Sequence, residues 1–147
     1  MKKQEYVEYV ESRAKKSPIF KNCVNAFIFG GSICILGQVF IDLYTFLGIE
    51  EKQSTSLASI SLIFIAVLLT GFGVFDNIAK VAGAGTLVPI TGFANAISSQ
   101  AIDSKSEGYV LGVGAKMFTI AGPVIVFGIL SGTIYGVIYY IFTLIQG

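Results

Sequence analysis

The chain has 147 residues, of which 54% are apolar and 13% are charged, and its formal net charge is +1. Its mean hydropathy of +0.76 lies outside the range of ordinary soluble domains, so we expect an integral membrane protein with one domain. The nearly balanced charge argues against a basic nucleic-acid footprint, which leaves lipid, protein or a small solute as partners.

Catalysis finds little support in the residue types. The sequence has no histidine, which is the commonest general base and metal ligand. It shows no catalytic-triad, zinc-ligand or phosphate-loop pattern, and Asp42 and Asp76 lie in separate apolar segments. Cys23 and Cys34 share a helix face but are separated by about 16 Å along it, too far to bridge. We therefore predict no catalytic residues, no cofactor and no metal site.

Residues 1–18 are the polar part of the chain. Tyrosine, valine and alanine recur there at helical spacing between charged residues, and Pro18 ends the pattern. We expect an amphipathic helix that either lies on the membrane surface or docks on a partner. Residues 19–147 then form the membrane domain.

Residues 24–47 form the first predicted span. They are interrupted only late, by Gln38 and Asp42, and extend about 36 Å as a helix, enough to cross a bilayer with some tilt. Several lysines and one arginine precede this segment, whereas the following loop offers only Lys52. The positive-inside rule therefore places the N-terminus in the cytoplasm.

Residues 57–75 carry no charge and form the second predicted span. Asp76 and Lys80 follow at i, i+4. They can pair on a continuing helix, which lowers the cost of charge near the bilayer, or they can be solvated charges at a helix end.

Residues 81–102 are again uncharged, but they cannot form one continuous helix. They are divided into two short pieces by Gly83, Gly85, Pro89 and Gly92. Backbone that is not helical at membrane depth must face protein or water, because unpaired N–H and C=O groups are costly in lipid. The sequence therefore predicts a re-entrant pair of half-helices.

Broken helices of this kind hold solutes in transport proteins, because half-helix N-termini present free N–H groups to anions. The second half-helix is expected to begin near Thr91 or Gly92, which places Asn95, Ser98 and Ser99 on one face.

Residues 109–145 would extend about 56 Å as a single helix, well beyond a hydrocarbon core. We predict a break at residues 121–123, which leaves a half-helix carrying Lys116 and a third span from Pro123 to Ile145. Lys116 is either a pathway residue, favouring an anion together with Lys80, or a side chain that snorkels to the interface. The predicted substrate pathway consists of Lys80, Gly83, Gly85, Pro89, Thr91, Asn95, Ser99 and Lys116.

Three glycines recur at intervals of four in the last span: Gly128, Gly132 and Gly136. Small residues at this spacing form a flat stripe on which another helix can pack closely. The partner is either a helix of the same chain or another subunit, and we favour another subunit because three spans and a broken pair close poorly.

Three longer runs resemble a known family: "NCVNAFIFGGSICILGQ", "LLTGFGVFDNIAKVAGAGTLVPITGFANAI" and "KSEGYVLGVGAKMF". They are similar to the stage V sporulation protein AC family of endospore-forming bacteria, from about residue 20 to about residue 128. A sister family, stage V sporulation protein AE, shares "GGxICxxGQ" and "AGAGxxVPIT". The polar leader and the "KSEG" turn favour AC.

The resemblance implies a subunit of the forespore or spore inner-membrane complex that moves dipicolinic acid, with calcium, into the spore and releases it at germination. It implies two partners, the AE membrane subunit and the soluble AD protein. The resemblance brings no site residues with it, so the pathway residues above rest on the sequence pattern.

Our leading hypothesis is an all-α polytopic membrane protein, with three spans and a re-entrant pair, that forms a passive solute pathway with other subunits. A rival hypothesis is a structural subunit that anchors the soluble partner and pairs with a separate pore through the glycine stripe. The rival predicts that Gly132→Leu destroys assembly while changes at Lys116 or Asn95 are tolerated. A small transporter acting alone is disfavoured, because so few spans rarely enclose a pathway.

Overall fold

The computed structural model describes Tyr9 and residues 17–146 of the chain. The amphipathic helix predicted for residues 1–18 lies almost wholly outside this part. The described segments are helical and follow one another as α2 (Ile19–Phe46), α3 (Glu51–Gly71), α4 (Phe75–Ala82), α5 (Ala84–Leu87), α6 (Ile90–Asp103), η1 (Ser104–Glu107), η2 (Tyr109–Gly114) and α7 (Ala115–Gln146).

Three segments are long and apolar enough to cross a membrane: Ile19–Phe46, Glu51–Gly71 and Tyr109–Ile145. The three predicted spans are therefore confirmed as helices of spanning length. Helices α2 and α3 begin before the apolar runs that were predicted as spans. Helix α3 also ends earlier than predicted, because Gly73 at φ +68 turns the chain.

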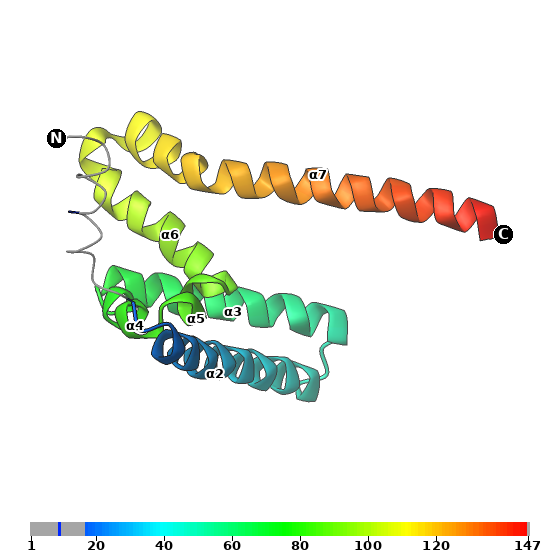
Figure 1. Ribbon diagram of the computed structural model, residues 1–147, viewed down its shortest axis with the longest axis horizontal. Coiled ribbons are helices and arrows are strands. Elements are labelled where there is room, and N and C mark those ends of the chain that lie inside the picture. The colour runs from blue at the N-terminus through cyan, green and yellow to red at the C-terminus, as the bar shows by residue number, and fades with distance from the viewer. Residues whose placement is uncertain (1–8, 10–16, 147) are drawn as a thin grey trace.

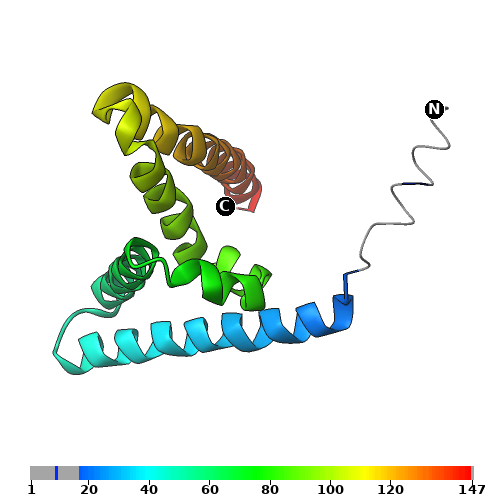
Figure 2. The same cartoon turned by 90° about the vertical axis from the view of Figure 1, so that its left-hand side faces the viewer.

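Helices α2 and α3 pack on each other and run in opposite directions across Figure 1, but they cross steeply, since α2 lies across Figure 2 while α3 is seen there nearly end-on. A hydrogen bond of 2.7 Å joins the hydroxyl groups of Tyr44 and Ser61 across this pair. A polar link of this kind fixes the register of two apolar helices, whose other contacts are non-directional.

The chain then breaks into short helices where the sequence predicts it. Gly83, between α4 and α5, has φ +54, a conformation that side chains other than glycine rarely adopt. Pro89 directly precedes α6, which begins one residue before the predicted Thr91. We call the segment α4–α5–α6 the hairpin.

The hairpin packs on α2 and α3, and the small apolar core lies between the hairpin and α3. This core consists of Ala66 on α3, Phe75 on α4 and Ala94 on α6. In Figure 1, α4 and the C-terminal end of α6 lie toward the left-hand end of the molecule, where α3 ends and α7 begins. The turn before α6 lies farther in, along α2 and α3.

The predicted break at residues 121–123 is wrong. Pro123 lies inside one continuous helix, α7, and Lys116 lies in its first turn, so there is no separate half-helix. A single proline removes one backbone hydrogen bond and need not end an apolar helix, because the rest of its ladder stays intact. The irregular stretch lies before α7 instead, in the π-helix η2.

Helix α7 extends away from the rest of the chain (Figure 1). Every side chain from residue 123 to residue 145 is exposed within this single chain. Its 37-residue segment, Tyr109–Ile145, is longer than a hydrocarbon core about 30 Å thick requires. The helix therefore either tilts strongly or projects beyond the bilayer.

Candidate functional site

Two polar contacts fix the flanks of the hairpin to the spans. Asn25 on α2 donates from Nδ2 to the carbonyl oxygen of Val81 at 3.1 Å. Val81 lies in the last turn of α4, where carbonyl groups lack a partner in their own helix. The side chain of Asn25 therefore stabilises the end of α4 against α2.

The other flank is fixed to α3. The Thr70 hydroxyl donates to Asn95 Oδ1 at 2.8 Å and also lies 2.7 Å from the carbonyl oxygen of Ala66. Asn95 was predicted to face the pathway, but in the structure its amide oxygen is used to hold α6 against α3.

Between these flanks, α5 crosses α2 at a contact between backbones. A Cβ added to Gly85 would lie 2.5 Å from the carbonyl oxygen of Ala26 and 3.0 Å from the amide nitrogen of Gly30. A Cβ added to Gly30 would lie no closer than 3.5 Å to Gly85. The crossing therefore requires glycine at position 85 and tolerates a methyl group at position 30.

One hollow, of about 370 Å³, opens beside this crossing at the start of α2. We call it the outer hollow. Its lining includes Asn22, Cys23 and Ala26 from α2, and Lys80, Gly83 and Ala84 from the hairpin. Lys80 supplies a positive charge, and its Nζ lies 3.4 Å from Asn77 Oδ1. The side chain of Lys80 therefore bonds to Asn77 and not to the Asp76 carboxylate, so the predicted ion pair between Asp76 and Lys80 is not formed.

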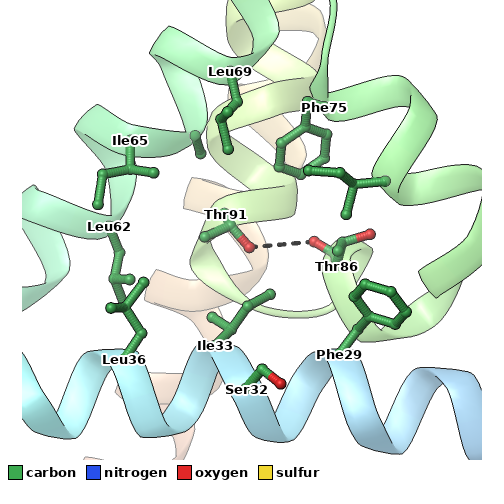
Figure 3. Close-up of a pocket in the computed structure, with 12 residues that line it drawn as sticks. Phe29, Ser32, Ile33, Leu36, Leu62, Ile65, Leu69, Phe75, Thr86 and Thr91 are labelled. Atoms are coloured by element: carbon green, nitrogen blue, oxygen red, sulfur yellow. Dashed lines mark hydrogen bonds between the residues drawn. The ribbon is translucent and has the colours of Figure 1, made fainter.

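A second hollow, of about 200 Å³, lies on the other side of α5. This inner hollow is mostly apolar and is lined from α2 by Phe29, Ser32, Ile33 and Leu36, which occupy the middle of that helix. Figure 3 shows Thr86 and Thr91 of the hairpin facing each other across it. The Thr91 hydroxyl donates to the carbonyl oxygen of Thr86 at 3.3 Å.

A third hollow, of about 360 Å³, lies between α3, α6 and the start of α7. Ser98 lines it, but the Ser98 hydroxyl donates to the carbonyl oxygen of Ala94 at 2.7 Å. Ser99 likewise donates to its own helix, at 3.2 Å from the Ala96 oxygen. Both serine hydroxyls of the predicted polar face thus donate to the backbone of α6 itself.

The structure brings some of the predicted pathway residues together and separates others. Lys80 and Gly83 share the outer hollow, and Thr91 lines the inner one. Gly85 makes the crossing between them, and Pro89 starts α6. Lys116 is exposed on α7 and lines none of the three hollows, so the structure does not join it to Lys80.

Sequence reasoning missed the contribution of α2. Asn22 and Cys23 line the outer hollow and Asn25 holds the hairpin, yet all three lie in or just before an apolar run. The signal that could have revealed this contribution is the pair of asparagines at the start of α2, because an amide in an apolar helix needs a partner.

The charges are unequal at the two ends of the α2–α3 pair. Lys21 and Lys80 lie at the end where α2 begins, whereas the opposite turn carries Glu50, Glu51 and Lys52. Within residues 17–146 and Tyr9, no group of three or more histidine, cysteine, aspartate or glutamate side chains could hold a metal ion. Lys80 is the charged side chain that lines the outer hollow.

Within residues 17–146, the glycine stripe packs on no other helix. A Cβ added to Gly128, Gly132 or Gly136 would meet nothing within 4 Å. The described residues thus offer no helix for it to pack on.

The comparisons with known proteins agree with the resemblance seen in the sequence. Residues 22–138 match the family described as SpoVAC/SpoVAEB sporulation membrane protein. The chain is 46% identical over 141 residues to stage V sporulation protein AC of Bacillus subtilis (strain 168), covering 95% of this chain and 94% of that protein. No solved structure matches. The chain therefore belongs to the SpoVAC/SpoVAEB family of sporulation membrane proteins and is a homologue of stage V sporulation protein AC.

Proposed function

We propose that this chain is a membrane subunit of the complex that moves dipicolinic acid, with calcium, across the forespore or spore inner membrane. The observation that carries the proposal is the hairpin, which places a lysine-lined hollow beside the backbone crossing of α5 and the candidate span α2. Dipicolinate is a small planar dianion, and a lysine ammonium attracts such a solute.

The hairpin is proposed to be re-entrant. Its two ends lie toward the end of the molecule where α3 ends and α7 begins, and its turn lies beside residues in the middle of α2. Irregular backbone at that depth is tolerated only where protein or water covers it. The excess of lysine at the start of α2 supports an N-terminus in the cytoplasm.

The mechanism is passive movement along a gradient, with the solute drawn first to Lys80. A neighbouring AE-like membrane subunit is proposed to complete the pathway, because one chain with three candidate spans leaves its hollows open. An AD-like soluble subunit would deliver or receive the solute. Lys116 remains a predicted pathway residue whose partners belong to the assembled complex.

The experiment is a charge reversal in sporulating cells. Lys80→Glu should assemble in the membrane but lower spore dipicolinate strongly, because a carboxylate in the outer hollow repels the dianion. Lys105→Glu, in η1 and outside the hollows, is the matched control with the same change in net charge. Normal dipicolinate in Lys80→Glu spores with normal assembly would refute the proposal.

A second candidate function is the structural subunit described above, and the exposed α7 favours it. A helix whose residues 123–145 are all exposed, judged on the part of the chain that the structure describes, suits a role in joining subunits. The two candidates differ on Lys80, which a purely structural subunit would not need.

A further inference from the structure

Hydrogen bonds join the flanks of the hairpin to the spans, whereas its centre packs closely on α2 without one. Asn25 bonds the end of α4 to α2, and Thr70 bonds α6 to α3. Among the residues that the structure describes, no hydrogen bond joins α5 itself to either span. Helix α5 is therefore held on α2 only by packing at the Gly85 crossing.

The same short helix separates the two hollows next to the crossing. Gly83 and Ala84 line the outer hollow, Thr86 lines the inner hollow, and Gly85 lies between them against α2. On the α2 side the division is the same, because Ala26 lines the outer hollow and Phe29 the inner one. One turn of helix is thus all that divides a charged hollow from an apolar one.

Both ends of α5 have backbone features that suit a hinge. Gly83 adopts φ +54 at its start, and Pro89 separates its end from α6. Hinges absorb their change in a few backbone angles at the ends of elements, while the flanking elements stay packed.

We propose that α5 is a movable barrier, which joins the outer and inner hollows when its Gly85 contact with α2 opens. This inference deepens the proposed function and rests on it only for the identity of the solute. A packing contact without hydrogen bonds can open without leaving a buried polar group unpaired.

The test places a single cysteine in the inner hollow of the full-length chain, in a Cys23→Ala, Cys34→Ala background. Ala66→Cys is the reporter, since Ala66 lines the inner hollow and is 1% exposed. Ala58→Cys is the control on the same helix, since Ala58 is 3% exposed and lines none of the three hollows. Labelling uses a charged, water-soluble maleimide on intact membranes without dipicolinate.

The expected result is slow labelling of both reporters in the parent chain. In the Gly85→Ala variant, the maleimide should label Ala66→Cys about tenfold faster, because the barrier opens without unfolding. Ala58→Cys should stay protected in the same variant. Gly30→Ala should change neither rate. Unchanged labelling of Ala66→Cys in folded Gly85→Ala protein, or fast labelling in the parent, would overturn the barrier.

A second variant decides the case in which Gly85→Ala unfolds the protein and exposes Ala58→Cys. Thr91→Val removes the bond to the Thr86 carbonyl with almost no change of shape, so it frees the end of α5. It should speed labelling of Ala66→Cys but not of Ala58→Cys, and no change would overturn the proposal. The labelling is done without dipicolinate, so a negative result would refute the barrier alone. Normal dipicolinate content in Lys80→Glu spores would instead refute the proposed function.

Discussion

Asn25 and Val81 are 56 positions apart in the chain, yet the Asn25 amide caps the Val81 carbonyl at 3.1 Å. This bond links the first candidate span to the end of α4, just before the chain breaks at Gly83. The hairpin is therefore anchored by a side chain from a segment that reads as a simple apolar span.

Replacing this amide should weaken the hairpin. Asn25→Leu removes the bond to the Val81 carbonyl, which we expect to lower the free energy of unfolding by about 0.5–1.5 kcal/mol. Unfolding by SDS in mixed micelles measures the effect. Asn22→Leu is the control, because Asn22 is exposed and, among the described residues, its side chain bonds to nearby Ser17 rather than to the hairpin. An equal effect of the two variants would contradict the capping role of Asn25.

Alanine substitutions at the two glycines of the α5–α2 crossing should differ sharply in their effect on the free energy of unfolding. Gly85→Ala forces a methyl group against the backbone of α2, so we expect a loss of about 1–3 kcal/mol in the same assay. Gly30→Ala should cost far less, since its methyl group would make ordinary contacts at 3.5 Å. Equal stability of the two variants would show that the backbones do not approach as closely as described.

The bond between Thr70 and Asn95 should appear as an energetic coupling. In a double-mutant cycle with Thr70→Val and Asn95→Leu, we expect a coupling of about 0.5–1.5 kcal/mol, in the range measured between membrane helices. The cycle separates this bond from the internal bond of Thr70 to Ala66. A coupling near zero would mean that α6 is held to α3 by packing alone.

These contacts show how far the sequence could be interpreted. Apolar length identified the three spans, and Gly83 and Pro89 identified the break, because both are properties of local backbone. The pairing of Asn25 with Val81 depends on how distant helices pack, which no local pattern contains. The same is true of Lys116, which the structure leaves apart from Lys80.

The break predicted at Pro123 failed for a related reason. Proline has a local cost, but whether a helix ends there depends on the hydrogen bonds and neighbours that remain. Continuity of α7 can be measured with spin labels at Thr119 and Thr133, which are exposed on either side of Pro123. A continuous helix predicts about 21 Å between their backbones, and Pro123→Ala should leave this unchanged. A distinctly shorter distance in the parent chain would contradict a continuous α7 and support the predicted break at residues 121–123.

The glycine stripe bears on the choice between pathway subunit and structural subunit. If α7 packs on another subunit through Gly132, Gly132→Leu should abolish recovery of the assembled complex, while the exposed Ile134→Leu should not. Co-purification of tagged subunits from sporulating cells measures this. Normal assembly of Gly132→Leu would remove the stripe as an interface. Loss of assembly would be compatible with both functions, so Lys80 decides between them.

The central claim is that solute reaches the outer hollow beside Lys80, and Cys23 is a native reporter there. In a Cys34→Ala chain, within assembled membranes, we would measure Cys23 labelling by an anionic and a cationic thiol reagent, with and without dipicolinate. We predict preference for the anionic reagent and protection by dipicolinate, and Lys80→Glu should remove both effects. Cys34, in a Cys23→Ala chain, should show neither. Equal labelling of Cys23 by both reagents, unaffected by dipicolinate, would contradict the account.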